Sequence, residues 1–356
     1  MKLKKLFAGV VAAAMMLTMA VPAFAADSID YGKSHHDLTD NTVTVEKSYV
    51  LNGVGTSPDE TFNFDIKNKS VSDAAQNVVK ENMPTPKVSG AAYTDGKIAT
   101  DKGTASDITI DFKNDTGNLI YTSVGVYKYT ITEIVPETPT AGVTYDEVPV
   151  EMTVTVVNGD EDGMLKILTV SFRKNDKKIT GTGDEPAFTN YYTASTLNIK
   201  KLVEGSMGDK SKDFDFTVSF EAPDGTAWTQ NSTLKLSYEQ NAMTIGNNEA
   251  SFTLSHKDEA TIINLPQGVT FTIVEDAESA DGYTTRFNDD TTDSANRTLV
   301  GSASGTKEGD SVIVHNIKGG EIDTGVILDN APYILMLAVV AAGAMTLVIK
   351  KRREEE

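Results

Sequence analysis

Residues 188–201 read FTNYYTASTLNIKK, and they join two strand patterns with no linker between them. Phe188-Thr189-Asn190 closes the first pattern, and Leu197-Asn198-Ile199-Lys200-Lys201 opens the second. Successive side chains of a strand point to opposite faces, so Leu197, Ile199 and Lys201 share one face. The direct join between the two patterns predicts two β domains that stack end to end.

Strand patterns of this kind recur from about residue 29 to residue 318. Apolar and polar residues alternate in residues 42–45, 129–132, 152–156 and 214–218. Turn residues separate the strands, as in residues 158–163 (NGDEDG). Only the segment from Ser72 to Met83 has a helical pattern, which predicts a short crossover helix. The expected fold class is therefore all-β, built from β-sandwich domains.

An internal repeat lies on top of this strand pattern. Residues 197–201 echo residues 43–47, and an F-x-F pair follows each copy (Phe62 and Phe64, Phe214 and Phe216). Residues 125–133 (GVYKYTITE) match residues 268–275 (GVTFTIVE), and a short strand ending in Asn closes each copy. We therefore expect a first domain over residues 29–193 and a second over residues 194–318.

Three polar residues in each copy fall on the face that alternation assigns to the core. Burying a lone ammonium or carboxylate is costly, so such residues should be paired or neutralised. Taken singly, each could lie at a strand end, where the pattern lapses and the side chain reaches water. The same order of Lys, Glu and Asn in both copies argues against coincidence; the residues are Lys47, Glu133 and Asn190 in the first copy and Lys201, Glu275 and Asn316 in the second.

Lys, Glu and Asn in an apolar pocket can form an amide. Burial lowers the pKa of the lysine, so that its amine becomes a nucleophile. The same surroundings keep the Glu protonated, so that it can hydrogen-bond the Asn carbonyl and shuttle protons as ammonia leaves. We therefore expect isopeptide bonds between Lys47 and Asn190 and between Lys201 and Asn316. Glu133 and Glu275 would catalyse their formation.

Both ends of the chain have the features of targeting signals. Three lysines precede an apolar run over residues 6–21, and Ala23-Phe24-Ala25 follows as a cleavage site, so residues 1–25 are predicted to be a secretory signal peptide. Residues 331–349 have no charge and are long enough to cross a bilayer. Residues 350–356 (KKRREEE) follow this span, and their basic residues should stay cytoplasmic.

The composition excludes several classes of function. The chain has no cysteine, which excludes disulfides, thiolate metal sites and cysteine nucleophiles. Its four histidines supply a metal centre poorly, and the acidic loop with Asp289, Asp290 and Asp293 lacks a calcium-ligand spacing, so we expect no metal and no cofactor. The net charge of −19 argues against a nucleic-acid partner.

With these features the chain resembles the backbone pilins of Gram-positive sortase-assembled pili. Residues 205–214 (GSMGDKSKDF) and 142–146 (GVTYD) look like the corresponding family segments, whereas Val314 stands where the family usually has Phe. The resemblance implies two tandem Ig-like (Cna-B-type) β-sandwich domains with intramolecular isopeptide bonds. It also implies a structural protein whose only catalysis is the formation of its own cross-links.

The segment before the predicted span is similar to the sorting signal of this family. Glu321-Ile322-Asp323-Thr324-Gly325 resembles a relative of L-P-x-T-G, and with the span and tail it makes residues 321–356 a sortase sorting signal. The cysteine of a sortase would attack the Thr324 carbonyl, release the chain from Gly325 onward, and pass the acyl group to an amine. The alternative is a simple membrane anchor with an incidental Thr-Gly.

The accepting amine should belong to the first domain, far from Thr324, so that subunits add head to tail. In the resembling pilins the linking lysine lies in the stretch that corresponds to residues 172–178 (FRKNDKK). This correspondence favours Lys177, followed by Lys178 and then Lys174. The alternative is that these lysines are merely solvated charges.

The resemblance thus implies a shaft subunit of a cell-surface pilus, anchored to the cell wall of a Gram-positive bacterium and used in adhesion. Its partners would be a pilus-specific sortase, further copies of itself, accessory pilins and peptidoglycan. Only the precursor would contact the membrane. One alternative is a surface adhesin anchored singly to the wall, but residues 317–320 leave no room for a long stalk. A secreted enzyme is another, but both repeats have the same features, unlike an enzyme with one site.

Overall fold

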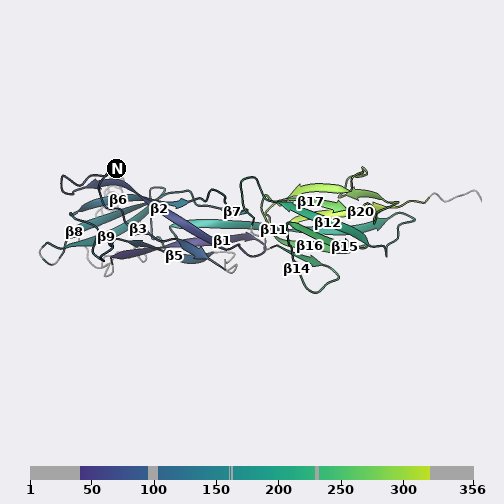
Figure 1. The fold of residues 1–356 in the computed structure, drawn as a ribbon, viewed down its shortest axis with the longest axis horizontal. Helices are drawn as coiled ribbons and strands as arrows, with labels where there is room; N and C mark the ends of the chain where they lie inside the picture. The colour runs from purple at the N-terminus through teal and green to yellow at the C-terminus, as the bar shows by residue number, and fades with distance from the viewer. Residues whose placement is uncertain (1–40, 95–102, 160, 162, 229–231, 321–356) are drawn as a thin grey trace, which may run out of the picture.

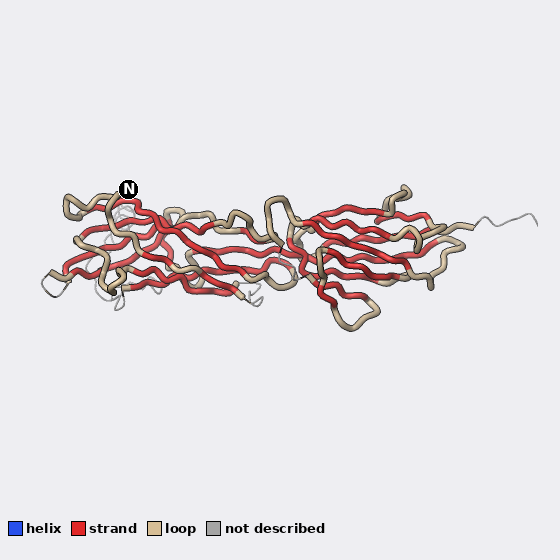
Figure 2. The backbone as a smooth tube through the Cα atoms, viewed as in Figure 1, coloured by secondary structure: helices blue, strands red, loops and turns tan. Residues whose placement is uncertain are grey.

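The computed structural model describes residues 41–94, 103–159, 161, 163–228 and 232–320 of the chain. These residues form strands, turns and loops, with no helix among them. Figure 1 shows two β domains arranged end to end, the first in purple to teal and the second in green to yellow. The strands run roughly along the length of the molecule, as the red segments of Figure 2 show. The all-β fold class predicted from the sequence is confirmed.

The first domain packs two sheets against each other. One contains β1, β3, β5, β7 and the first part of β11, and the other has the order β10-β9-β8-β6-β2-β4. Alternating side chains from both sheets, such as those of Ile108, Tyr129 and Val154, fill the space between them. The strands are β1 (Thr42–Gly53), β2 (Glu60–Ser72), β3 (Lys87–Val88), β4 (Ala91–Tyr93), β5 (Thr104–Asp111), β6 (Gly125–Ile134), β7 (Val143–Thr144), β8 (Val150–Asn158), β9 (Leu165–Lys174) and β10 (Lys177–Ile179).

The second domain repeats this two-sheet plan. One sheet contains β14, β13, β16, the second part of β11, β20 and β18, and the other has the order β15-β12-β17-β19. A separate core, with Phe214, Ile262 and Val312 among its members, lies between these sheets. The strands are β12 (Phe214–Glu221), β13 (Thr233–Leu236), β14 (Met243–Thr244), β15 (Glu249–Leu254), β16 (Glu259–Pro266), β17 (Thr270–Glu275), β18 (Thr284–Phe287), β19 (Thr298–Ser302) and β20 (Asp310–Ile317).

Strand β11 (Phe188–Glu204) belongs to both domains. Its first part pairs in parallel with β1 and its second part in parallel with β20. The buried positions are even-numbered up to Ala194 and odd-numbered from Ser195 onward, and a bulge against β16 lies between Ser195 and Leu197. This irregularity turns the strand so that each half presents its apolar side to its own core. One continuous strand therefore closes the first domain and opens the second.

Close backbone contacts tie the two domains together at this junction. Asn264, in the left-handed region at φ 66°, donates from Nδ2 to the backbone oxygen of Thr56 over 2.9 Å. Within the first domain, Gly53 at φ 98° pairs with Ala194 at the end of β1, so close to its backbone that a Cβ atom would overlap the carbonyl oxygen. A β-bridge between Thr140 and Ala227 adds a further link. The junction is thus connected by several segments besides β11.

The predicted helix over residues 72–83 is wrong. Ser72 ends β2, Asp73 adopts a left-handed conformation at φ 55°, and separate turns follow. The side chain of Asn82 accepts a hydrogen bond from the backbone N–H of Val79, which replaces a helical backbone bond. The segment is also largely exposed, so no apolar face stabilises a helix there.

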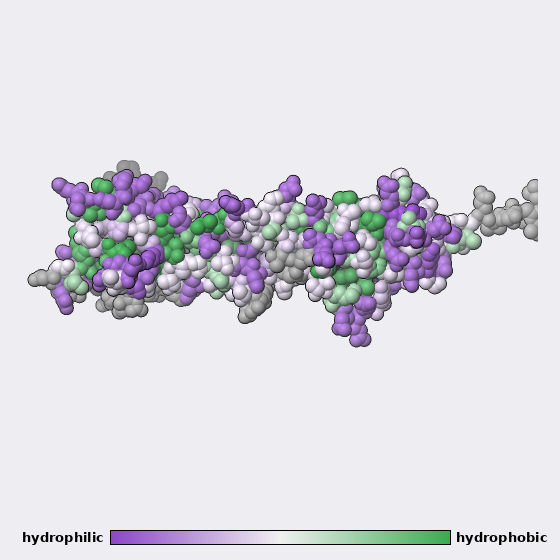
Figure 3. Space-filling view, viewed as in Figure 1, coloured by the Kyte–Doolittle hydropathy of each residue, from purple (hydrophilic) through white to green (hydrophobic). Residues whose placement is uncertain are grey.

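Figure 3 shows hydrophilic residues along the visible face of both domains, with smaller apolar areas between them.

Candidate functional sites

The first buried polar cluster joins three strands of the first domain. Lys47 lies on β1, Glu133 on β6 and Asn190 on β11, so both sheets contribute to it. Lys47 and Asn190 are fully buried, and Glu133 is 7% exposed. The structure therefore brings together the three residues that the alternation of the sequence placed on the core face.

Glu133 contacts both other members of this cluster. Its Oε2 lies 3.1 Å from Lys47 Nζ, and its Oε1 accepts a hydrogen bond from Asn190 Nδ2. The backbone N–H of Asp146 donates to Asn190 Oδ1 over 2.8 Å. The centre of the Phe62 ring lies 4.5 Å from Lys47 Nζ. The amine thus lies between an aromatic ring and a carboxylate, and the amide is held at both its nitrogen and its oxygen.

The second cluster has the same three residue types in the second domain. Lys201 on β11, Glu275 on β17 and Asn316 on β20 are all buried. Glu275 Oε1 accepts hydrogen bonds from Lys201 Nζ over 2.6 Å and from Asn316 Nδ2 over 2.7 Å. The buried hydroxyl of Thr285 lies 2.7 Å from Glu275 Oε2 and 3.1 Å from Asn316 Oδ1. One carboxyl group therefore bridges the amine and the amide of this cluster too.

Strand register is the same at the two clusters. Lys47 pairs with Phe188, two residues before Asn190. Lys201 pairs with Val314, two residues before Asn316. Each glutamate pairs with one Phe of an F-x-F pair: Glu133 with Phe64 and Glu275 with Phe216. Backbone geometry therefore builds the same arrangement of side chains twice.

Burial changes the charge balance of both clusters. Desolvation lowers the pKa of Lys47 from 10.5 to about 8, because it outweighs the attraction of Glu133. Desolvation also lowers the pKa of Lys201 to about 8, against the attraction of Glu275. Burial raises the pKa of Glu133 above its usual value. In the first cluster these shifts lower the free-energy cost of the state with a neutral amine and a neutral carboxylic acid relative to the ion pair.

A neutral amine next to a primary amide is suited to transamidation. The amine is the nucleophile, the amide carbon is the electrophile, and the carboxyl group can move protons between them. The sequence did not single out the two donors to the amide oxygens, the Asp146 N–H and the Thr285 hydroxyl. The position of a backbone N–H cannot be recognised from a residue type. Thr285 could have been found, because alternation places it on the core face of a short strand together with Phe287.

The three candidate linking lysines occupy the hairpin between β9 and β10. Lys174 Nζ donates to Asp146 Oδ2 over 2.6 Å and to the Ala187 oxygen over 2.9 Å, so this amine is engaged. Lys177 and Lys178 are exposed, and the amine of Lys177 makes no hydrogen bond or ion pair with the described residues. The contact with Ala187 places this hairpin on the flank of the first domain, beside the start of β11, and not at the tip of the molecule.

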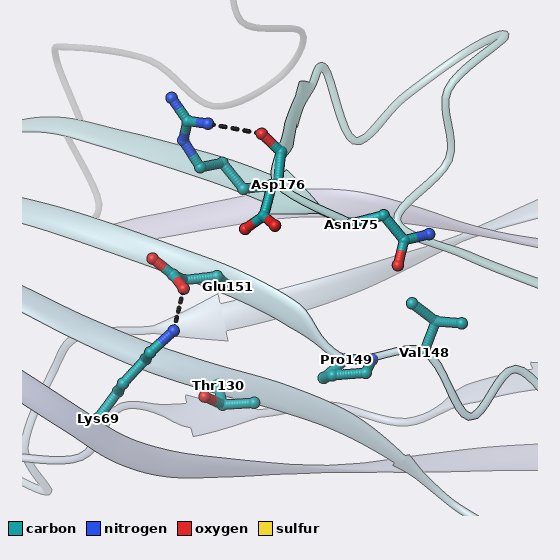
Figure 4. Close-up of a pocket in the computed structure, with 8 residues that line it drawn as sticks. Lys69, Thr130, Val148, Pro149, Glu151, Asn175 and Asp176 are labelled. Carbon is teal, nitrogen blue, oxygen red and sulfur yellow. Dashed lines mark hydrogen bonds and ion pairs between the residues drawn. The ribbon is translucent and has the colours of Figure 1, made fainter.

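An open pocket of about 260 Å³ adjoins this hairpin (Figure 4). Asn175 and Asp176 form one side of it, and Val148 and Pro149 form another. Lys69 is paired with Glu151 on the sheet below, and Arg173 donates to the backbone oxygen of Asp176. The surface beside Lys177 is therefore hollow and polar.

Several predicted features lie outside the described residues. These are the signal peptide (1–25), the sorting motif with Glu321, Ile322, Asp323, Thr324 and Gly325, the span (331–349) and the charged tail (350–356). In the part of the chain that the structure describes, no helix is long and apolar enough to cross a bilayer. Nor do the described residues contain a cluster of acidic or histidine side chains that could hold a metal ion.

Comparison with known proteins finds similarity in both domains. Residues 43–193 match the family described as the Spy0128-like isopeptide containing domain, and residues 195–318 match a domain of unknown function, DUF7601. The chain is 28% identical over 347 residues to a pilin of Streptococcus pyogenes serotype M1, covering 93% of this chain and 96% of that protein. The chain is a pilin homologue, and its first domain matches the isopeptide-containing family.

Solved pilin structures share the fold of this pilin homologue. The major pilin from Streptococcus pyogenes matches with a TM-score of 0.55 at 23% identity, over 79% of this chain and 99% of that chain. The T3.2 major pilin of the same species matches with a TM-score of 0.53 at 21% identity, over 81% of this chain and all of that one. The resemblance to the backbone pilins that the sequence predicted is confirmed, and the pilins are structural proteins of cell-surface pili.

Proposed function

We propose that this chain is the shaft subunit of a covalently assembled pilus and that it cross-links itself once in each domain. The bonds join Lys47 to Asn190 and Lys201 to Asn316, with loss of one ammonia each. One observation supports this most directly: a buried Lys, Glu and Asn recur at the same strand register in both domains. If each Lys–Glu pair were only a structural ion pair, it would not require a buried Asn side chain beside it. Nor would it require the same contacts in both domains.

The positions of these bonds suit a fibre under tension. Each bond links the first strand of its domain to the last, and β11 carries the load from one domain to the next. Force that enters through one terminal strand leaves through the other across a covalent bond. The sandwich between them then need not unfold.

Polymerisation joins the C-terminal end of one exported chain to the first domain of the next. A sortase cleaves after Thr324 and transfers its acyl group to a lysine of the next subunit, for which we propose Lys177, with Lys178 as the second choice. Lys177 is supported by its exposure and by the open pocket beside it, which leaves room for a sortase-bound acyl group. The last subunit is joined to the cell wall by the same chemistry.

Peptide mapping of polymer isolated from cell walls tests this function. The proposal predicts three branched peptides, which link Lys47 to Asn190, Lys201 to Asn316, and Thr324 to Lys177 or Lys178. Internal bonds together with Thr324 joined to the wall alone would favour a singly anchored adhesin. Recovery of Lys47, Asn190, Lys201 and Asn316 with unmodified side chains from folded protein would contradict the proposal for the internal bonds.

A further inference from the structure

The oxygen of each reactive amide has its own hydrogen-bond donor, and the two donors differ. In the first domain the backbone N–H of Asp146 lies 2.8 Å from Asn190 Oδ1. In the second domain the hydroxyl of Thr285 lies 3.1 Å from Asn316 Oδ1. Donors at these distances stabilise the negative charge that develops on a carbonyl oxygen during acyl transfer.

The two donors come from equivalent segments of the domains. Each segment follows the catalytic glutamate, begins at a glycine with positive φ (Gly142 at 79° and Gly282 at 77°), and pairs antiparallel with the strand that holds the Asn. Thr285 pairs with Asn316. The pairing of Thr144 with Tyr191, continued by one residue, would put Tyr145 opposite Asn190.

Tyr145 cannot supply a donor to Asn190 because its side chain is directed elsewhere. Its ring packs edge-on against Phe62, with the ring centres 5.9 Å apart, and its hydroxyl accepts from the Thr140 N–H. The next residue, Asp146, provides its backbone N–H instead. The Asp146 carboxylate fixes this N–H in place, since it accepts from Lys174 Nζ and from the backbone N–H of Thr189 over 2.7 Å.

We infer that Thr285 is a catalytic residue of the second cross-link. Its hydroxyl donates to the oxygen of the reactive amide, as the Asp146 backbone N–H does in the first domain. This inference rests on the proposed self-formed bonds. The hydroxyl lies between Glu275 Oε2 and Asn316 Oδ1, so it can accept a proton from one and donate to the other. The backbone N–H of Thr285 donates a hydrogen bond to Asp293 Oδ1 over 3.1 Å, which holds this residue in place.

The atoms balance without any added reagent. The lone pair of Lys201 Nζ attacks Asn316 Cγ and forms the new C–N bond, while the amine gives a proton to Glu275 Oε1. The proton on Oε2 moves through the Thr285 hydroxyl to the developing oxyanion at Asn316 Oδ1. Oε1 then protonates the amide nitrogen, the C–N bond to it breaks, ammonia leaves, and the proton on Oδ1 returns through Thr285.

The variants Thr285→Ser and Thr285→Ala test this inference, because they differ from each other only by the hydroxyl. The full chain is expressed in a pulse, translation is stopped, and samples taken over time are denatured and digested. Peptide mapping then follows the two bonds separately. We expect Ser to form the Lys201–Asn316 peptide within a few-fold of the wild-type rate and Ala to form it roughly 100-fold more slowly.

The bond in the first domain is the internal control, and Lys47–Asn190 should form at the wild-type rate in every variant. Thr284→Val, on the other face of β18, is the matched surface control and should leave both rates unchanged. Equal rates in the Ser and Ala variants would overturn the role of Thr285 while the cross-links themselves stand. If wild-type protein forms neither bond, the proposed function fails instead.

Discussion

Lys201 on β11 pairs in register with Val314 on β20. The corresponding partner of Lys47 in the first domain is Phe188, whose ring packs against Phe64 with the ring centres 4.8 Å apart. Val314 provides no aromatic ring at this position. Phe214 lies over the second amine as Phe62 lies over the first, with its ring centre 4.4 Å from Lys201 Nζ, and the Phe216 ring centre is 5.5 Å away. The second amine is therefore also desolvated, although its register partner provides no aromatic ring.

Replacing the bridging carboxyl groups should prevent the cross-links and leave the fold intact. Glu133→Gln and Glu275→Gln keep the side-chain shape but cannot take a proton from the amine. Each lost bond would otherwise close a loop of more than about 100 residues, which is worth roughly 4–5 kcal/mol. We expect the Tm of the affected domain to fall by about 10–20 °C, as measured by calorimetry. The exposed Glu137→Gln and Glu278→Gln variants are the controls, and an equal fall in them would contradict the account.

The rate of cross-linking in the first domain should pass through a maximum with pH. The reactive state, a neutral Lys47 with a protonated Glu133, carries the same number of protons as the ion pair. Below the raised pKa of Glu133 both groups are protonated and the amine cannot attack. Above the lowered pKa of Lys47, about 8, both have lost a proton and no acid remains to release ammonia.

Refolding of unbonded chain over a pH series, followed by acid quench and peptide mapping, measures this profile. The rate should fall on both sides of a plateau that ends near pH 8, the lowered pKa of Lys47. A rate that keeps rising well above that pKa would show that the amine alone limits the reaction and that Glu133 donates no proton.

Pulling on the chain should distinguish bonded from unbonded domains. In single-molecule force spectroscopy from Asn41 to Gly320, wild type should show no unfolding step for either domain, because both terminal strands are covalently joined. Glu275→Gln should release the second domain alone, and the double variant with Glu133→Gln should release both. Unfolding of both domains in wild type at ordinary forces would mean that the bonds are absent or do not bear load.

Polymer length should depend on the hairpin lysines. With the cognate sortase, Lys177→Ala should shorten the high-mass ladder in boiled wall extracts, and Lys177→Ala with Lys178→Ala should abolish it. Lys80→Ala, also exposed in the first domain, is the control and should keep the ladder. A ladder that persists in the double variant would remove both lysines from consideration.

Much of this architecture could be predicted from the sequence, because alternation encodes it directly. The period of two placed Lys47, Glu133 and Asn190 on a core face. The same order of Lys, Glu and Asn in the second copy argued against coincidence. The bulge near Ser195 could not be predicted, since a shift of face within one long strand depends on contacts with β16. The same holds for the Asp146 N–H, whose position is set by tertiary contacts with Lys174 and Thr189. The helix over residues 72–83 failed for a related reason, because a local helical pattern without a buried face does not make a helix.

We propose that each domain forms its own Lys–Asn bond, and the intact mass of the folded, purified protein is the decisive measurement. With both bonds formed, the mass should be lower than that of the mature sequence by two molecules of ammonia. The variant with Glu133→Gln and Glu275→Gln together should show the full sequence mass. A wild-type protein that is fully folded, yet has the unmodified sequence mass, would contradict the account.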